Sequence, residues 1–366
     1  MTRRHVILLA PGFIENGGCA SHAQKLAYGL SHRGNDVTVL ARHGSARRLR
    51  RLRRGRVQVI EFPGFGRALI GAIIYLVAGG SLAVLRGRRA VFLALQLSSP
   101  ACVGALASTV WRAPFVVLST STGPLGEVAE ASHGWRRHLR GRVLGRATWC
   151  VGQTEDAAAE LRRLRADAVV IVPTPVVSPS RPPALDGGAR ALYTGRLARG
   201  KNLTALVHAW GHVLDVRPEA RLTLAGAGIP GDATEAELRH LLAHDSRLAT
   251  AVDMPGWVTD VGPLLRTRDV FVLLSDAEGM SNALLEATAH GRVCVVSDIP
   301  SNRAVLGDGH PLFAPTDDEQ AIADVILRAF CDAEARSEAL RRARAAAARS
   351  DVVAVCGRLA ELLEAR

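Results

Sequence analysis

Two glutamates separated by seven residues, Glu278 and Glu286, have the spacing and surroundings of ligand-binding carboxylates. Between them Ser281 is a good N-cap for a helix over residues 282–290, whose first amides would point at a bound anion. The amides concerned are those of Asn282, Ala283 and Leu284. Carboxylates on either side of an anion suit hydroxyl groups, because they accept O–H donors. The segment therefore predicts a site for a phosphate flanked by hydroxyl groups, which is the chemistry of a nucleotide sugar.

Two cations form a second candidate group. Arg196 and Lys201 fall between an expected strand over residues 190–193 and a helix expected to begin at Asn202. Loops at the carboxyl ends of parallel strands line the ligand crevice of an open sheet. An arginine fork and a lysine point charge there suit a diphosphate. The chain has only two lysines, so the use of one at this position is informative.

Glycine-rich turns follow two of the expected strands. Gly17 and Gly18 come after the first strand, where backbone amides can approach an anion at a helix start, although a plain tight turn has the same composition. Residues 226–231 read GAGIPG, which matches a dinucleotide-binding fingerprint. Pro230 inside this turn, and its place after the second strand of the second half, argue against NAD binding.

These residues are carried by alternating short apolar runs and segments of helical period. Such runs, each followed by a helix, predict parallel strands buried on both faces. We therefore expect an α/β protein with two doubly wound parallel sheets. The expected strands cover residues 5–9, 37–40, 57–60, 91–94, 115–118, 148–152 and 169–172 in the first half, and residues 190–193, 221–225, 250–254, 270–274, 293–297 and 311–313 in the second.

A proline-rich segment divides the two halves. Residues 173–188 contain five prolines, which remove backbone donors and exclude this stretch from a sheet interior. We expect a domain over residues 1–175, a linker over 176–188 and a second domain over 189–348. A last helix, residues 349–366, is expected to cross back to the first domain.

Charge is distributed unevenly between the halves. The net charge is +16 over residues 1–180 and −4 over residues 181–366, which indicates that the first half faces a polyanion. Aromatic residues make up 4% of the chain, too few for the stacking platforms of nucleic-acid binding, so no nucleic-acid partner is expected. Six scattered cysteines are typical of reduced thiols in a cytoplasm.

Two segments of the first half bear on a membrane partner. Residues 42–56 contain eight arginines, for which a solvated loop is the default reading and attraction to anionic lipid the functional one. Residues 68–85 carry no charge over 18 positions. A helix packed under the sheet is the favoured interpretation, with a surface-docking helix second and a membrane span third.

The spacing E278-GMSNALL-E286 resembles the E-x7-E motif of retaining GT-B glycosyltransferases of the GT4 group. The segments YTGRL and KN, the GAG turn, PGWVTD and the Gly-Gly loop occur in that family's order, so the resemblance covers nearly the whole chain. It implies a GT-B fold, in which two Rossmann-like domains face a central cleft, with the acceptor bound by the first domain and the donor by the second.

The resemblance also implies roles for individual residues. Arg196 and Lys201 would neutralise the donor diphosphate, Glu278 would bind hydroxyls of the donor sugar and also act in catalysis with the two cations, and Glu286 would bind the ribose. The remaining residues implied on the donor side are Gly17, Gly18, Gly226, Trp257, Val258, Gly279, Met280, Ser281, Asn282 and Ala283. Enzymes of this kind need no metal and no cofactor beyond the nucleotide sugar.

The sequence departs from the family at one position near the expected reaction centre. Many relatives carry a histidine on the loop after the fifth strand of the first domain. That loop here reads Ser119, Thr120, Ser121 and Thr122, which are the candidates on the acceptor side. The turn before the linker, Pro173-Thr174-Pro175, also differs from the family's usual sequence, which affects the hinge and not the fold.

The expected activity is transfer of a hexose-type sugar, with retention, from a nucleotide diphosphate to a lipid-linked or saccharide acceptor. The expected location is cytoplasmic, at the inner face of the plasma membrane, with an anionic membrane surface as a partner. Two alternatives remain open, a catalytically silent nucleotide-sugar-binding subunit and a sugar-nucleotide epimerase of similar build.

Overall fold

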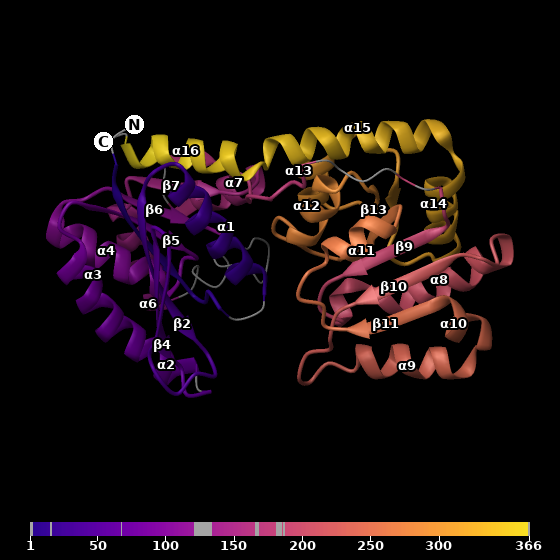
Figure 1. The fold of residues 1–366 in the computed structure, drawn as a ribbon, viewed down its shortest axis with the longest axis horizontal. Helices are drawn as coiled ribbons and strands as arrows, with labels where there is room; N and C mark the ends of the chain where they lie inside the picture. Colours follow the sequence, from indigo (N-terminus) through magenta and orange to yellow (C-terminus); the bar gives the residue numbers. More distant parts are fainter. Residues whose placement is uncertain are drawn as a thin grey trace. The chain divides into compact units, whose positions relative to one another are not determined.

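The computed structural model describes residues 3–14, 17–66, 68–120, 134–164, 168–180, 185 and 187–364. The chain forms two compact units (Figure 1). One contains Met1–Pro175 together with Ser350–Arg366, and the other contains Val176–Arg349. We call them the N-terminal and the C-terminal unit.

A single eight-stranded sheet forms the centre of the N-terminal unit. Its strand order is β3-β4-β2-β1-β5-β6-β7-β8, and neighbouring strands are parallel except for β3 and β4. The buried runs of Val, Ile and Leu fall where the sequence predicts strands. The strands are β1 (His5–Ala10), β2 (Asp36–His43), β3 (Arg50–Arg54), β4 (Val57–Pro63), β5 (Ala90–Leu95), β6 (Phe115–Leu118), β7 (Trp149–Gly152) and β8 (Val169–Ile171).

The expectation of a solvated loop over residues 42–56 is wrong in part. Strand β3 lies within it and pairs antiparallel with β4 through a turn at Gly55, whose φ is 56°. All five residues of β3, which is an edge strand of the sheet, are exposed. A strand with neither face buried has no apolar alternation, and this is why the sequence pattern does not reveal it.

Helices cover both faces of the N-terminal sheet. On one face α1 packs beside the last helix, α16, so that Leu26 and Leu30 share a buried core with Leu359. On the other face α4 packs with η1 and α3. The helices are α1 (Gly18–His32), α2 (Ala68–Ile74), the π-helix η1 (Tyr75–Gly79), α3 (Gly80–Arg86), α4 (Ser99–Trp111), α6 (Gly134–Arg146), α7 (Glu155–Leu164) and α16 (Val352–Glu364).

The apolar segment expected as a buried helix is buried on its inner side only. Tyr75 and Ala83 are 1% and 0% exposed, whereas Leu69 and Leu85 are 74% and 78% exposed. By length and composition the helical stretch Leu69–Arg86 is apolar enough to cross a membrane, and 28% of it is buried in the protein. The expectation of full burial is therefore wrong for the outer face, because hydropathy alone does not say which face a protein covers.

The C-terminal unit is a six-stranded parallel sheet in the order β11-β10-β9-β12-β13-β14. Its strands are β9 (Arg190–Thr194), β10 (Arg221–Ala225), β11 (Val252–Gly256), β12 (Val270–Leu273), β13 (Val293–Ser297) and β14 (Phe313–Ala314). Its helices are η2 (Arg199–Lys201), α8 (Leu203–Val216), α9 (Thr234–His244), α10 (Ser246–Ala251), α11 (Gly262–Thr267), α12 (Asn282–Ala289), α13 (Pro300–Leu306), α14 (Glu319–Cys331) and α15 (Ala333–Arg349).

The strand order of the C-terminal unit places its functional loops. The chain runs from β9 to β10 on one side of the sheet and later returns to β12 on the other side of β9. The loops after β9 and β12 therefore leave the sheet next to each other at its carboxyl edge. Such a topological switch point is where open α/β sheets bind ligands. The expectation of two doubly wound α/β domains is confirmed.

Candidate active site

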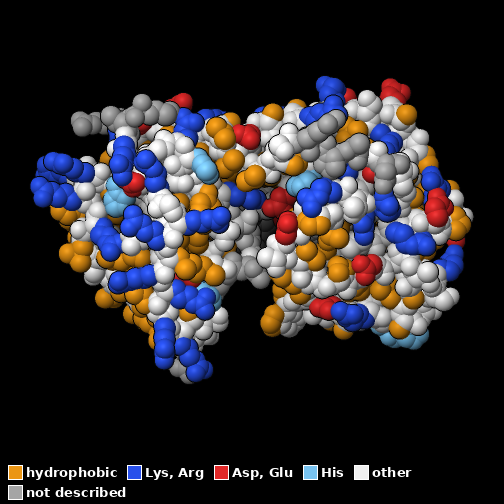
Figure 2. Space-filling model, viewed as in Figure 1, with side chains coloured by type: hydrophobic (Ala, Val, Ile, Leu, Met, Phe, Trp, Pro, Cys, Tyr) orange, Lys and Arg blue, Asp and Glu red, His pale blue; other side chains and the backbone are white. Residues whose placement is uncertain are grey.

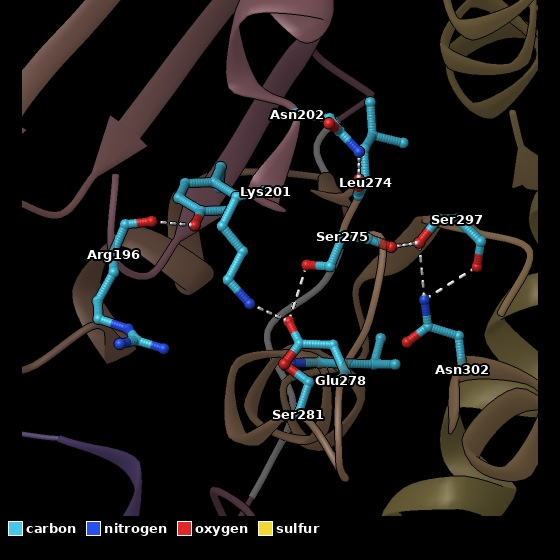
Figure 3. A network of polar contacts seen from close by, with 11 residues as sticks. Arg196, Lys201, Asn202, Leu274, Ser275, Glu278, Ser281, Ser297 and Asn302 are labelled. Atoms are coloured by element: carbon cyan, nitrogen blue, oxygen red, sulfur yellow. Dashed lines mark hydrogen bonds and ion pairs between the residues drawn. The ribbon is translucent and has the colours of Figure 1, made fainter. Parts of the chain in front are cut away.

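Charged residues gather at the switch point of the C-terminal unit. Arg196 follows β9, and Lys201 ends the short helix η2 in the same loop. Glu278 lies in the loop between β12 and α12. Figure 3 shows the Arg196 and Lys201 side chains extending from their loop toward the same side, with Lys201 directed at Glu278.

Lys201 and Glu278 form a direct ion pair. The Lys201 Nζ lies 2.5 Å from the Glu278 Oε1, and both side chains are 16% exposed. The Ser275 hydroxyl donates a hydrogen bond of 2.8 Å to the same carboxylate oxygen. Since partial burial strengthens charge interactions, each group holds the other in place. The pair brings a cation of the kind that suits phosphate and a carboxylate of the kind that suits hydroxyl groups into direct contact.

A buried chain of hydrogen bonds supports Ser275 from behind (Figure 3). The Ser297 hydroxyl donates to the Ser275 carbonyl over 2.6 Å, and the Asn302 amide donates to the Ser297 carbonyl over 2.9 Å. Ser275 and Ser297 are fully buried, and Asn302 is 1% exposed. The ends of β12 and β13 are thus tied together beneath Glu278. The sequence interpretation did not identify these three residues. The one signal in the sequence was that Ser275 directly follows an apolar run and Ser297 ends one.

We expect Ser275→Ala to lower kcat/KM about tenfold to a hundredfold while the protein stays folded. The variant removes one neutral-to-charged hydrogen bond, worth about 1.5–3 kcal/mol, from a carboxylate that keeps its lysine. Steady-state kinetics with separate kcat and KM, together with thermal unfolding, would measure the effect. Ser275→Thr retains a hydroxyl and should recover part of the loss. If the alanine variant were as active as the wild type, Ser275 would have no positioning role.

Asn202 fastens the two functional loops to each other. It has a left-handed backbone, φ 52°, and its side-chain amide donates to the Leu274 carbonyl over 2.8 Å and to the Asp276 carboxylate over 2.5 Å. The Asp276 amide in turn donates to the Gly200 carbonyl over 3.1 Å. The helix expected to begin at Asn202 begins one residue later, with α8 at Leu203. The Asn202 side chain reaches across to the β12 loop instead of capping the helix. The positions of Lys201 and Glu278 are coupled by these bonds.

The backbone of Arg196 is fixed by Tyr193. The Tyr193 hydroxyl donates to the Arg196 carbonyl over 2.7 Å. Burial, followed by the nearby Glu278 charge, raises the pKa of Tyr193 well above its usual value, so the phenol stays protonated and remains a donor. The Arg196 side chain itself is exposed. A cation on a fixed backbone with its guanidinium in solvent is available to an incoming phosphate.

The GAG turn runs alongside the Arg196 loop. The Gly195 amide donates to the Ala225 carbonyl and the Leu197 amide to the Ala227 carbonyl, over 3.0 and 2.9 Å. A Cβ at Gly226 would lie 1.7 Å from the Gly195 carbonyl oxygen, so only glycine fits there. Helix α9 begins only at Thr234, not within the GAGIPG turn. The turn serves to hold the cation loop, which agrees with the argument against NAD binding.

Two carboxylates secure the far end of the GAG turn. Glu235 accepts a hydrogen bond of 2.7 Å from the Gly228 amide, and Asp232 accepts one of 3.1 Å from the Arg199 amide. Hydrogen bonds from Thr234, together with that from Arg199, lower the pKa of Asp232 to about 2. Asp232 is therefore ionised at neutral pH and holds the start of η2 in place.

Helix α12 begins at the expected position with one difference. Ser281 accepts a hydrogen bond from the Leu284 amide over 3.4 Å, as an N-cap does. The expectation that the Leu284 amide is open to a ligand is therefore wrong, because the cap uses it. Glu286 lies one turn after Asn282 on the same side of α12 and is half-buried. Gly279, Met280 and Ala283 lie beside the cap, and the two larger side chains pack partly against the core.

The remaining donor-side residue pair lies at the edge strand β11. Trp257 follows this strand with its side chain 45% exposed, whereas Val258 packs against the core. An exposed indole beside a carboxyl edge offers a flat apolar surface to a ligand. Its assignment to the base of the donor stays a prediction.

The N-terminal unit carries the other predicted residues at its own carboxyl edge. Gly17 has φ 143°, which requires glycine, and Gly18 begins α1. Ser119 is buried and its amide donates to the Val151 carbonyl over 2.9 Å, and Thr120 follows it. Ser121 and Thr122 lie outside the described residues. The Gln96 amide donates to the Cys19 thiol over 3.1 Å, a contact that the sequence interpretation did not find.

Metal binding is not indicated in the part of the chain that the structure describes. Within it, no group of three or more His, Cys, Asp or Glu side chains is placed to hold a metal ion. That the reaction needs no metal stays a prediction.

Comparison with known proteins assigns the family. Residues 188–332 match the family described as "Glycosyl transferases group 1", and residues 17–176 match the family described as "Glycosyl transferase 4-like domain". The chain belongs to the group 1 glycosyltransferases of GT-B fold. The glycosyltransferase therefore matches one family description in each unit, and the two matches together cover most of its length.

Individual relatives are distant. A phosphatidyl-myo-inositol mannosyltransferase of Mycobacterium tuberculosis is 26% identical to this glycosyltransferase over 95% of this chain and 93% of its own. A UDP-Gal:alpha-D-GlcNAc-diphosphoundecaprenol alpha-1,3-galactosyltransferase of Escherichia coli is 31% identical over 31% of this chain, which spans only 28% of that relative's length.

Solved structures share the fold. A sucrose-phosphate synthase from Thermosynechococcus elongatus has a TM-score of 0.80 at 18% identity, covering 99% of this chain and 98% of its own. Anabaena Alr3699/HepE in complex with UDP and glucose has a TM-score of 0.74 at 18% identity, covering 99% and 100%. At these identities the likeness shows that the glycosyltransferase has their fold.

Proposed function

We propose that this glycosyltransferase moves a hexose from a nucleotide diphosphate to a hydroxyl of the acceptor, with retention at the anomeric carbon. The observation that carries the proposal is the Lys201–Glu278 ion pair at the switch point, with Arg196 exposed beside it. In a donor of this kind the diphosphate and the sugar hydroxyls lie close together. The cations Arg196 and Lys201 can therefore bind the diphosphate while Glu278 binds the hydroxyls. The motif E-x7-E supports the choice of a retaining enzyme.

The proposed step breaks the bond between the anomeric carbon and the diphosphate oxygen. The electron pair stays on the diphosphate, the acceptor oxygen bonds to the anomeric carbon on the same face, and the acceptor proton passes to the departing diphosphate. Negative charge grows on that group, so Arg196 and Lys201 stabilise the transition state more than the bound donor. Glu278 holds sugar hydroxyls and fixes the ring. This step uses no metal and no cofactor.

The two members of the ion pair match two parts of the proposed donor. Lys201 and Glu278 neutralise each other in the structure. The proposed donor offers each of them a partner of its own, a phosphate for Lys201 and hydroxyls for Glu278. Asn202 and Ser275 keep both groups close to their positions, so little reorganisation is needed.

The names of relatives support the substrate class. The E. coli relative is named for a UDP-sugar and a diphosphoundecaprenol acceptor, and the M. tuberculosis relative for a phosphatidyl-myo-inositol. We infer a lipid-linked acceptor or a growing cell-surface saccharide, and hence a place in polysaccharide or glycolipid biosynthesis. We infer from such acceptors a location at the cytoplasmic face of the membrane. The positively charged N-terminal half suits a phosphate-bearing acceptor there.

A thermal-shift panel tests the donor assignment. UDP, GDP and their hexose derivatives are added to the full chain, with AMP and NAD as controls. One nucleotide series should raise the melting temperature, since a ligand at 100 times its Kd adds about 2.7 kcal/mol of stability. Lys201→Ala should remove most of that shift. Equal responses to all nucleotides, or a shift that survives in the alanine variant, would contradict a diphosphate site at Lys201.

A second candidate function is a nucleotide-sugar-binding subunit without activity. The sequence feature that favours it is Ser119-Thr120, at the place where the family resemblance leads us to expect a histidine. Such a subunit would bind the donor and give neither transfer nor slow donor hydrolysis. Product analysis with the donor found in the thermal-shift panel distinguishes the two, and also identifies an epimerase, which would convert the donor without an acceptor.

A further inference from the structure

The segment α2–η1–α3 presents a continuous apolar surface to solvent. Its large exposed side chains reach 74% exposure at Leu69, 66% at Val77 and 78% at Leu85. The others on this outer face are Ile70, Ile73 and Leu76. Soluble proteins seldom leave a run of this kind uncovered, so it marks a surface that meets something apolar.

The inner side of the same segment is fastened to the sheet. The Tyr75 hydroxyl, buried to 1% exposure, donates to the Leu40 carbonyl in β2 over 3.0 Å. A Cβ at Gly71 would lie 2.8 Å from the Cα of Gly64, so the helix backbone touches the strand's end. A transmembrane position would break both contacts. The segment therefore lies flat on the sheet with its apolar side outward.

Helix α4 extends this surface and adds the amphipathic indole ring of Trp111. The Trp111 indole nitrogen donates to the Val84 carbonyl of α3 over 2.7 Å, while the side chain remains 37% exposed. Leu106 and Val110 of the same helix are 56% and 51% exposed. Tryptophan with one apolar edge and one satisfied N–H is typical of a membrane interface.

Arginines border the apolar surface on the same face of the sheet. In the β3–β4 pairing, Arg51 is opposite Ile60 and Arg53 is opposite Gln58. Ile60 belongs to the core beneath η1, and Gln58 accepts a hydrogen bond from Arg86 at the end of α3. Opposed residues of an antiparallel pair point to one face, so Arg51 and Arg53 flank α2–η1–α3.

The surrounding sequence carries almost no compensating negative charge. Residues 37–120 contain thirteen arginines, and their one carboxylate, Glu61, is 0% exposed. Arg88 and Arg89 follow α3 and are exposed. Figure 2 shows the orange side chains along the outer edge of the N-terminal unit, over α2 and α3, with blue groups at either end. An apolar strip bordered by cations complements anionic headgroups over acyl chains.

We propose that the outer face of α2–η1–α3, with Trp111 and with Arg51 and Arg53 at its border, docks the protein on an anionic phospholipid bilayer. The apolar side chains enter the boundary between headgroups and acyl chains, and the arginines bind lipid phosphates. The lipid-linked acceptor of the proposed function supplies the reason for such a surface, and to that extent this inference rests on it. The docking itself is measured without donor or acceptor.

Vesicle flotation of the full chain tests the docking. The protein should float with phosphatidylcholine vesicles that contain phosphatidylglycerol and should stay at the bottom with phosphatidylcholine alone. The double substitution Leu69→Gln/Val77→Gln should lower the partition coefficient at least tenfold, because two buried apolar side chains are lost. Val353→Gln is the matched control, since Val353 is 61% exposed on α16 of the same unit, and it should float as the wild type does.

Neighbouring arginines on β3 give a matched test of the charge. Arg53→Gln should weaken binding about fivefold. Arg54 pairs with Val57 on the opposite face and lies over the Tyr28 ring, so Arg54→Gln should change binding less than twofold. Equal effects of the two substitutions would indicate attraction to net charge only and would overturn the assigned face.

The remaining outcomes separate this proposal from its competitors. If the wild type does not float with anionic vesicles, or if Leu69→Gln/Val77→Gln floats equally well, the bilayer assignment is wrong. A dimer in light scattering that the same double substitution abolishes, without vesicle binding, would assign the surface to a second copy of the chain. Resistance of the bound protein to alkaline carbonate would indicate a span. Donor thermal shifts should be unchanged in every variant, so failure here leaves the donor site standing.

Discussion

Replacing Glu278 by glutamine is expected to lower kcat/KM by about two to three orders of magnitude, the usual cost of losing one charged group that acts in the transition state. The amide keeps the shape and an oxygen that can still accept the Ser275 hydroxyl, but it loses the charge that pairs with Lys201 at 2.5 Å. The position of the donor sugar ring and the orientation of the Lys201 side chain should both become less well fixed. Initial rates with the nucleotide sugar found in the thermal-shift panel would measure the loss.

The matched control for this substitution is Glu219→Gln. Glu219 is also an ion-paired glutamate of the C-terminal unit, 2.6 Å from Arg217, but its side chain is 59% exposed. It should leave turnover unchanged, since exposed pairs contribute little. Both variants should keep the wild-type circular dichroism spectrum. Near-normal turnover of Glu278→Gln would refute the assignment of the donor site.

Gly226→Ala is expected to weaken donor binding strongly. It should also lower the free energy of unfolding by about 1–3 kcal/mol, which is the usual cost of overpacking. The added Cβ would lie 1.7 Å from the Gly195 carbonyl oxygen, which is backbone and cannot rotate away. The turn must therefore separate from the loop that carries Arg196. Urea unfolding and the donor-induced thermal shift would report the two effects independently.

A second glycine provides the control. Gly211 lies within α8, and a Cβ there would have no atom within 4 Å. Gly211→Ala should stabilise the protein by up to about 1 kcal/mol, because alanine favours the helix, and donor binding should not change. If Gly226→Ala bound donor like the wild type, the close approach of the GAG turn would have no part in holding Arg196.

The fold was predictable because buried parallel strands leave a clear pattern. Runs such as residues 270–274 are apolar throughout and end in functional loops, and the observed strand Val270–Leu273 matches this. The edge strand Arg50–Arg54 has no such pattern, because none of its residues is buried. Likewise, hydropathy marks residues 68–85 as apolar but cannot tell that Leu85 faces solvent while Ala83 faces the sheet.

The site was predictable only at the level of loops. Strand order brings the loops after β9 and β12 together, and the charged residues in them are visible in the sequence. The ion pair between Lys201 and Glu278 joins residues 77 positions apart, and no periodicity reports such a contact. The support comes from the Ser275 hydroxyl, which donates to the Glu278 carboxylate, and from the Asn302 amide, which donates to the Ser297 carbonyl. Many polar residues in these loops would be able to make such hydrogen bonds. Only coordinates reveal them.

The packing of α16 against α1 has a consequence for how the protein is made. Four buried side chains of α16 complete a core whose other buried members come from the first 175 residues: Val355, Cys356, Leu359 and Leu363. During synthesis on a ribosome, that core stays open until residues 352–364 emerge. The unit encoded second can finish folding while the unit encoded first still waits, which reverses the usual order for two-domain chains. A stop codon after Arg349 would leave the α1 face bare and invite aggregation.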